Sequence, residues 1–387
     1  MSSYIYSNAN RSYAVPESTF GVPAIITSAN RFPAFRVHAR QVYHAVQRRD
    51  KTGGRTLLTS SSPVRSEASF DVETYLVSSP DPATNAYGAL FQAACGGAPS
   101  ISGSLSVANA QGLQIQTAAA HSLAVGSAVS FSGEIRFVTA VPDAQTIFLN
   151  APFSSALSAG AACDPAVTYR LGTNLPSLSI YDYWDPVTAV SRILTGAVVD
   201  LLSISIDGPY HEFSFSGTAS DLIDSANVGA GGSITSFPVE PPVAPLNYAV
   251  VPGNLGQLWI GTPASQFFTV TDGSVRLKNN IELRNREYGS LTPRAFTCGR
   301  RDILTRLSLL ATDEAQTVAL YAAAKARAPL SLILQLGNQR GQLLAVYLPN
   351  MVPAVPVYDD TRPRLSWEFE NNTALGNAND ELYLALA

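Results

Sequence analysis

Apolar and polar residues alternate along several short stretches of the chain, and turn residues separate these stretches. In the clearest example, residues 198–219, apolar residues from Leu202 to Ile206 alternate with serines before an Asp-Gly-Pro turn. The return stretch alternates again and places Phe213 and Phe215 on one face. Alternation with period two on both sides of a turn is typical of a β-hairpin. The segment therefore predicts two paired strands with one apolar, partly aromatic face.

A similar hairpin pattern stands near the C-terminal end, at residues 351–374. An apolar stretch meets an Asp-Thr-Arg-Pro turn and returns through Trp367 and Phe369. These two aromatic residues align with Phe213 and Phe215 of the first hairpin. The second half of the chain also repeats the order of the first: strand, long loop, strand, helix, strands, hairpin. The sequence therefore predicts two similar domains in tandem.

Strand and helix patterns place the matching elements of the two halves. The helix over residues 313–327 has the clearer end signals, with Thr312 expected as N-cap and Asp313 and Glu314 in the first turn. Residues 217–228 predict a short helix or a turn. The matching segments are the strands 35–45 and 274–283, the strands 66–77 and 301–311, and the helices 85–94 and 313–327.

The composition changes sharply between the first predicted helix and the strands after it. Residues 96–172 are rich in Ala, Ser and Gly, nearly free of charge, and contain five or six short strand patterns. We therefore expect a mainly β chain: two tandem β-sandwich or barrel domains, each with one flanking helix, plus a small all-β inserted domain. The expected divisions are an extended arm at 1–34, a first domain at 35–95 and 173–228, the inserted domain at 96–172, a linker at 229–245, and a second domain at 246–387.

Composition excludes several function classes. Only 14% of the 387 residues are charged and the net charge is −4, so no overall positive field attracts nucleic acid. Four histidines and three cysteines are too few and too scattered for a metal site or a disulfide framework. The low, odd number of cysteines fits a protein that folds in a reducing cytosol. The N-terminus lacks the pattern of a signal peptide, and no apolar run is long enough for a membrane span or anchor.

No residue pattern indicates catalysis, a cofactor or a metal ion. The glycines at 229–232 are followed by Ser-Ile-Thr-Ser instead of the Gly-Lys-Ser/Thr of a phosphate-binding loop. His38 and His44 share a strand face but lack a third ligand at a suitable spacing. Cys298 lies near two arginines but has no histidine base beside it. We therefore expect a protein that is not an enzyme and binds no cofactor.

Basic residues cluster in the two long loops that occupy equivalent places in the halves. Nucleic-acid contact is one interpretation, but aromatic residues for base stacking do not alternate with these charges. A solvated loop and a contact with acidic surfaces of neighbouring subunits are the two stronger interpretations, and we favour contacts between subunits or rings. The candidate residues are Arg48, Arg49, Lys51 and Arg55 in the first loop, and Arg284, Arg286, Arg294 and Arg300 in or beside the second.

Several segments resemble the tail tube (major tail) proteins of long-tailed bacteriophages. In the second half they are LQLGNQRGQ at 334–342, VYLPN at 346–350 and TALGNANDELYLA at 373–385. In the first half they are ILTGA at 193–197 and the strand SFSGTA at 214–219. The resemblance covers both halves outside the inserted segment and rests on the order of elements together with these diffuse motifs.

The resemblance implies a structural virion protein whose sheets join edge to edge into rings, which stack helically into a conduit for DNA ejection. Members with two fused tube domains form homotrimeric rings of pseudo-sixfold symmetry, whereas single-domain members form hexamers, which remain the alternative. Its partners would be the tape measure, terminator and distal tail proteins. Viral DNA would pass through without specific binding, so the lumen should expose polar and acidic residues. The protein would be made in the host bacterial cytoplasm and reside in the tail.

Two other functions stay open at this stage. Another ring-forming tail component, such as a tail terminator or distal tail protein, would share these features without polymerising. A carbohydrate-binding adhesin could use the inserted domain and the aromatic residues Tyr181, Tyr183 and Trp184. The missing signal-peptide pattern counts against the adhesin.

Overall fold

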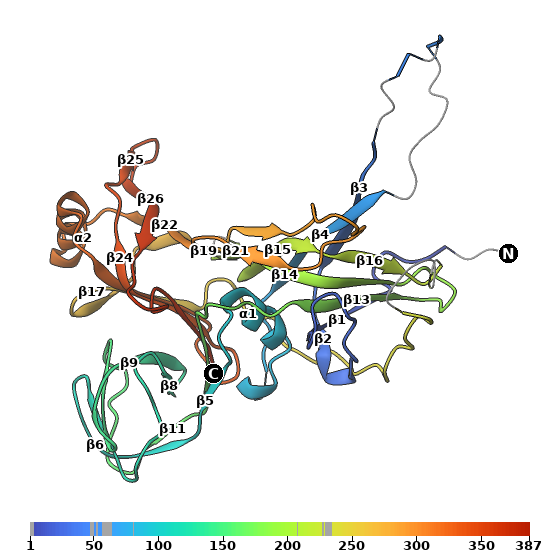
Figure 1. The fold of residues 1–387 in the computed structure, drawn as a ribbon. Coiled ribbons are helices and arrows are strands. Elements are labelled where there is room, and N and C mark those ends of the chain that lie inside the picture. Colours follow the sequence, from blue (N-terminus) through green and yellow to red (C-terminus); the bar gives the residue numbers. More distant parts are fainter. Residues whose placement is uncertain are drawn as a thin grey trace.

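A computed structural model of the chain describes residues 4–46, 50–51, 53–55, 64–79, 81–206, 208–226, 228 and 234–387. Within these residues the protein is mainly β, with two α-helices, α1 (Gly88–Cys95) and α2 (Ala315–Ala326). Both helices lie where the sequence predicts them. A mainly β fold with one helix in each half was the prediction from the hydrophobic pattern, and the structure confirms it (Figure 1).

The strands and short 3-10 helices fall into two runs along the chain. Up to residue 224 the elements are β1 (Asn10–Pro16), η1 (Ser28–Asn30), β2 (Arg31–Phe32), β3 (Arg36–His44), β4 (Arg65–Tyr75), η2 (Pro82–Thr84), β5 (Ser100–Ser102), β6 (Leu105–Gln111), β7 (Gln114–Thr117), β8 (Ala128–Phe131), β9 (Glu134–Asp143), β10 (Thr146–Leu149), β11 (Ala162–Cys163), β12 (Ala166–Arg170), β13 (Leu178–Trp184), β14 (Arg192–Ser205), β15 (Glu212–Ala219) and β16 (Asp221–Asp224). After residue 255 they are β17 (Gly256–Gly261), β18 (Ala264–Phe267), β19 (Val270–Lys278), β20 (Ile281–Leu283), β21 (Phe296–Cys298), β22 (Asp302–Leu310), β23 (Leu330–Leu336), β24 (Leu344–Val352), β25 (Val357–Asp359), β26 (Ser366–Ala374) and β27 (Tyr383–Leu386).

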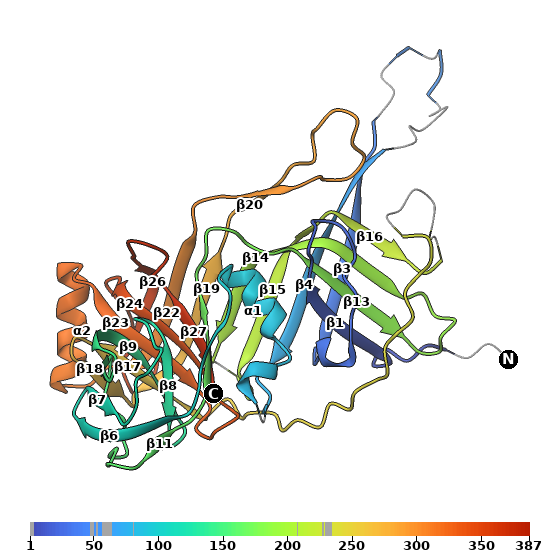
Figure 2. The same cartoon turned by 60° about the horizontal axis from the view of Figure 1, so that its bottom comes forward.

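One long antiparallel sheet runs through both halves of the chain. Its strands pair in the order β3, β4, β15, β14, β19, β22, β26, β25. The first four strands come from the first half and the last four from the second, and each set has the same internal order. The pairing of β14 with β19 joins the two sets, so the halves share a single sheet (Figure 2).

The two hairpins predicted from the sequence occupy equivalent places in this sheet. In the first, Ser205 pairs with Glu212; in the second, Asp359 pairs with Ser366; six residues separate the partners in both. Phe213 of β15 and Trp367 of β26 each stand one residue after the start of their strand. Because the spacing is equal, Phe213 and Trp367 occupy equivalent positions in their hairpins, as the sequence alignment places them.

Each helix covers the apolar face of its own half. Phe91 of α1 packs against Phe213 and Phe215, with ring centroids 5.8 and 5.4 Å apart. In the second half Tyr321 of α2 packs against Trp367 at 5.3 Å. The aromatic faces of both hairpins therefore pack against the helices. Edge-to-face contacts of this kind add to the free energy of ordinary apolar burial.

Two local predictions are wrong. Helix α2 begins at Ala315 with Glu314 as its N-cap residue, and Thr312 instead exchanges a hydroxyl hydrogen bond of 2.9 Å with Thr317. Residues 217–228 contain neither a helix nor only a turn: β15 continues to Ala219 and β16 follows. The pairing of β16 with β14, which is distant in sequence, makes this polar stretch a strand.

A second layer of strands lies on the far side of the apolar core. In the second half the order is β18, β17, β23, β24, β27, β12, β5. Strands β5 and β12 stand at the two ends of the predicted inserted segment, yet they extend this layer of the second half. Between them, β6 to β11 form a separate six-stranded sheet, so the segment holds eight strands where the sequence predicts five or six.

A buried polar network joins the six-stranded unit to the second layer of strands in the second half. Arg136 of β9 is fully buried; its guanidinium pairs with Glu134 at 2.9 Å and lies 4.6 Å from the ring centre of Trp259 in β17. Glu134 also accepts a hydrogen bond of 2.7 Å from the amide of Gln257. Burial lowers the pKa of Arg136 to about 10, while the charge of Glu134 opposes this shift.

Close packing accompanies these polar contacts. The rings of Phe137 and Tyr347 stack with centroids 5.0 Å apart. Gly133, at the β8–β9 turn, has a φ of 76°, and a Cβ atom there would stand 2.2 Å from the carbonyl oxygen of Asn338. The turn therefore needs glycine both for its backbone and for the approach of the two loops. The unit lies beside the strands of the second half (Figure 1), and these contacts pack it against them.

We expect Arg136→Ala to lower the free energy of unfolding by about 3–5 kcal/mol, because it leaves the buried carboxylate of Glu134 without its counter-charge. Chemical denaturation of the purified variant measures this change. Arg306→Ala is the control: Arg306 pairs with Asp272 at 2.9 Å on a partly exposed surface. Its loss should cost no more than about 1 kcal/mol. Equal effects of the two substitutions would contradict the anchoring role of Arg136.

Candidate assembly surfaces

The long sheet ends in two strands that each have one unpaired edge within the described residues. There, β3 pairs only with β4, and β25 pairs only with β26. Unpaired edges expose backbone N–H and C=O groups and can pair with another chain. These two edges are therefore the first candidates for contacts between copies.

The edge at β25 is far more exposed than its equivalent within the chain. Ile204 of β14 and Tyr358 of β25 hold equivalent places, because they lie opposite the first aromatic residue of the return strand, Phe213 and Trp367 respectively. Ile204 is 1% exposed because β19 covers its strand, whereas Tyr358 is 52% exposed. The neighbouring Val357 of β25 and Val318 of α2 are also exposed. Among the described residues, the edge of β25 thus has no neighbouring strand, whereas β19 covers the equivalent edge of β14.

The other face of the long sheet is polar and carries more acidic than basic residues. Alternation along the paired strands places six Arg or Lys side chains and nine carboxylates on this face, among the strand residues that the structure describes. The basic residues are Arg36, Arg40, Arg65, Arg276, Lys278 and Arg306, and the acidic ones are Glu67, Asp71, Glu73, Glu212, Asp272, Asp302, Asp359, Glu368 and Glu370.

Charge is unevenly distributed between the two ends of the sheet. On β3 the residues of the polar face include Arg36, His38 and Arg40. At the opposite end, the edge strand β25 contributes Asp359. The edge strand β3 is therefore basic, although Arg36 pairs with Glu73 of β4, and the edge strand β25 is acidic, which is a complementary arrangement for contact between copies.

The structure describes six of the eight basic loop residues predicted as contacts, and these six lie in separate places. Arg48 and Arg49 lie outside the described residues, while Lys51 and Arg55 are exposed beyond the ends of β3 and β4. Arg284 pairs with Glu287, and it lines a surface pocket together with Arg286. Arg300 is exposed and pairs with Asp302 at 3.3 Å. Arg294 is exposed.

The second loop lies against the first half of the same chain. The guanidinium of Arg65 in β4 donates to the carbonyl oxygen of Glu287 at 2.9 Å, and the backbone N–H of Ser66 donates to the carbonyl oxygen of Leu291 at 2.8 Å. The side chain of Asn285 binds the carboxylate of Glu67. The loop after β20 therefore crosses the β14–β19 junction and reaches the base of the β3–β4 hairpin (Figure 2).

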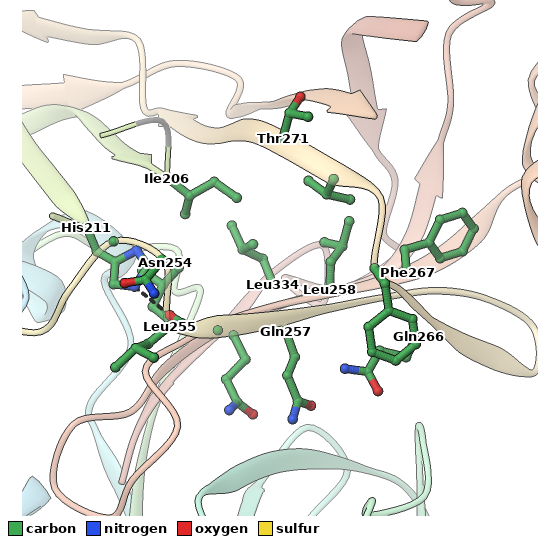
Figure 3. A pocket seen from close by; sticks show the side chains of 16 residues that line it. Ile206, His211, Asn254, Leu255, Gln257, Leu258, Gln266, Phe267, Thr271 and Leu334 are labelled. Carbon is green, nitrogen blue, oxygen red and sulfur yellow. Dashed lines mark hydrogen bonds between the residues drawn. The ribbon is translucent and has the colours of Figure 1, made fainter. Parts of the chain in front are cut away.

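A pocket of about 400 Å³ lies beside this junction, where the first half meets β17 and β19 (Figure 3). Its lining mixes apolar side chains such as Ile206 and Leu258 with backbone groups and the amide of Gln266. His211 stands at one end, and its Nε2 lies 2.7 Å from the carbonyl oxygen of Leu255. No pair of acid and base groups converges there among the described residues, so the pocket offers no evident chemistry.

His211 is buried and its other ring nitrogen, Nδ1, has no hydrogen-bond partner among the described atoms. Burial lowers the pKa of His211, and the hydrogen bond to Leu255 only partly offsets this. The folded protein therefore holds the neutral imidazole with Nε2 protonated. Within the described residues no cluster of metal-ligating side chains occurs, and no helix is long and apolar enough to cross a membrane.

Comparison with known families decides the class of this protein. The family model for phage tail tube proteins matches residues 7–377. The chain belongs to the phage tail tube protein family. This membership identifies it as a structural component of the virion tail that assembles with itself and associates with other tail proteins. No curated protein matches the chain significantly.

Some residues of the assembly surfaces were not recognised from the sequence. The alternation Arg36, His38, Arg40 was visible, but only the position of β3 at a sheet edge gives it significance. Asp359 directly precedes the predicted Asp-Thr-Arg-Pro turn; its carboxylate accepts a hydrogen bond of 3.0 Å from the backbone N–H of Thr361 and faces the polar side of the free edge. Hydrogen bonds from Thr361 lower the pKa of this exposed carboxylate.

We expect the folded protein to lose stability as the pH falls below about 6.5, the ordinary pKa of histidine. Because the pKa of His211 is lower in the folded state, the unfolded chain binds a proton first, and stability is fully present only above that pH. Denaturation midpoints between pH 8 and pH 5 measure this. His211→Gln should flatten the decline, and the exposed His38→Gln is the control. An unchanged profile in His211→Gln would contradict the assignment.

Proposed function

We propose that three copies of this phage tail tube protein form a ring in which β25 of each copy pairs with β3 of the next. The observation that supports this most is the β14–β19 pairing, which joins two sheets of equal strand order within one chain. Repeating the same junction between copies would join six equivalent sheets into a closed inner barrel. Closure would leave no free strand edge, which is how barrels avoid uncontrolled pairing.

The distribution of polarity supports a conduit. The apolar face of the long sheet is covered by α1 and α2, so the polar face is the one left for the lumen. Carboxylates outnumber Arg and Lys on this face, and such a surface repels phosphates more than it binds them. Viral DNA would then pass without being held.

The remaining surfaces fit roles outside the lumen. The β3–β4 hairpin projects beyond the body of the protein (Figure 1) and would reach the next ring, with Lys51 and Arg55 among its contact residues. The six-stranded unit packs on the outer layer and would decorate the outside of the tube. The tape measure, terminator and distal tail proteins would be the other partners.

Negative-stain electron microscopy of the purified protein tests this proposal. We expect long tubes built of stacked rings, because both the lateral edges and the projecting hairpin are available for assembly. Single rings that do not stack would instead support a tail terminator or distal tail protein. A protein that stays monomeric at high concentration, under conditions in which it is folded, would contradict the proposal.

Lumen chemistry gives a second test. Ser203 and Ser214 pair directly on the polar face, with no charge of their own. Changing both to Lys should leave tube formation intact but create binding of short duplex DNA that weakens steeply with salt. Sedimentation of labelled DNA with the tubes measures this, and the Ser→Asn pair is the control. No DNA binding by intact Lys-substituted tubes would contradict the placing of this face in the lumen.

A further inference from the structure

We propose a residue-by-residue register for the contact between copies: β25 pairs antiparallel with β3 so that Tyr358 lies opposite Ala39 and Asp359 opposite His38. This proposal rests on the proposed ring and specifies which atoms close it. The partner is a second copy of this chain, and the occupant of each free edge is the opposite free edge. The intrachain β14–β19 junction supplies the template.

The first step relates β25 to β14. Both strands pair with the return strand of their hairpin over the same six-residue separation. Phe213 pairs with Ile204, and the equivalent Trp367 pairs with Tyr358. Ile204 and Tyr358 therefore hold the same place, and their side chains point to the same apolar side. Ser205 corresponds to Asp359 in the same way.

The second step relates β3 to β19 through the strands beside them. Phe213 pairs with Thr74 of β4, and Trp367 pairs with Leu309 of β22, which sets these two strands in correspondence. Four residues earlier on each strand stand Phe70 and Thr305. Their partners on the neighbouring strands are Ala39 of β3 and Val275 of β19. Ala39 is therefore the equivalent of Val275.

The template pairing then fixes the register. Ile204 lies opposite Val275 in the intrachain junction, so Tyr358 should lie opposite Ala39 of the next copy. Both are apolar-face residues that remain partly or largely exposed in the single chain. In the same way Ser203 lies opposite Arg276, so Val357 should lie opposite Arg40. A slip by one residue would set Tyr358, which points to the apolar face, opposite His38 or Arg40, which point to the polar face.

Charge favours this register over its neighbours. With Asp359 opposite His38, its diagonal neighbours on the same face are Arg36, which pairs with Glu73, and Arg40, whose side chain has no hydrogen-bond or ion-pair partner among the described residues. Each free edge thus supplies the charge that the other lacks. The intrachain junction has no such pair: serines of β14 face Ser274 and Arg276 there.

A proline limits the length of the contact. Ile206 donates its backbone N–H to the carbonyl oxygen of Gly273, so alternate residues of β14, including Leu202, also point N–H groups toward β19. The equivalent of Leu202 is Pro356, which has no N–H to donate. The paired segment between copies should therefore begin at Val357 and remain short.

The same alternation identifies residues suited to cross-linking. Because 204 and 206 form the hydrogen-bonded pairs, 203 and 205 form the non-hydrogen-bonded ones, whose Cα atoms lie closest, at about 4.5 Å. Val357 with Arg40, and Asp359 with His38, are the equivalent pairs between copies. A disulfide spans this distance without strain.

The experiment uses full-length protein with Cys298→Ser, since Cys95 and Cys163 are buried and Cys298 is exposed. We expect Val357→Cys with Arg40→Cys to give, after mild oxidation of assembled protein, a disulfide-linked ladder that ends at the trimer. The matched controls pair Val357→Cys with Val42→Cys or with Arg36→Cys, which shift the contact along the same face. These should cross-link at least about tenfold more slowly, since diagonal and more distant pairs lie too far apart.

The outcomes separate the register from the ring itself. Tubes or rings by electron microscopy, with cross-linking in a control pair but not in the predicted pair, would overturn the register and keep the proposed function. Absence of any assembly in the folded Cys298→Ser protein would overturn both. A ladder that ends at six chains would keep the register and replace the trimer by a hexamer.

Charge reversal gives an independent readout. Asp359→Lys should raise the protein concentration needed for assembly by on the order of tenfold, equivalent to about 1.4 kcal/mol per contact. Adding Arg40→Glu should restore most of the loss, because the diagonal pair is then re-formed with opposite signs. Asp143→Lys, at the exposed end of β9 in the six-stranded unit, controls for net charge. Equal effects of the Asp359 and Asp143 changes, with no rescue, would overturn the charge pairing.

Discussion

The pairing of β14 with β19 is the interaction on which the rest of this structure depends. It turns two sets of four strands into one sheet and gives both halves a common apolar core. It also shows what covering such an edge does: Ile204 is buried, whereas its equivalent Tyr358 is exposed. In the proposed ring, the open edge at β25 would repeat this contact with another copy. Membership of the phage tail tube family implies that copies of the chain assemble with one another.

The two faces of the long sheet differ in polarity and in what covers them. The polar face of the long sheet carries no helix and keeps a surplus of carboxylates. The two helices and the outer strands enclose the apolar core, and Phe91, Phe213 and Phe215 hold the first half together. The six-stranded unit contacts the second half through Arg136 and Glu134.

Local patterns in the sequence predicted much of this fold, and contacts between distant segments account for what they missed. The hairpins and helices were predictable because alternation and an apolar stripe are short-range signals. The helix start was misplaced because Glu314 has an extended backbone and acts as the cap residue in place of Thr312. Residues 221–224 are a strand only because β14 pairs with them. The basic row on β3 gains meaning only when β25 is known to end the same sheet.

A cryo-electron microscopy reconstruction of the assembled protein tests the central claim most directly. The account predicts three chains per ring and an unbroken inner sheet in which β25 of one copy continues into β3 of the next, with the acidic surplus facing the lumen. A ring of six chains would contradict the duplicated architecture as it is used here. A ring whose inner sheet is interrupted between β25 and β3 would contradict the account of closure itself.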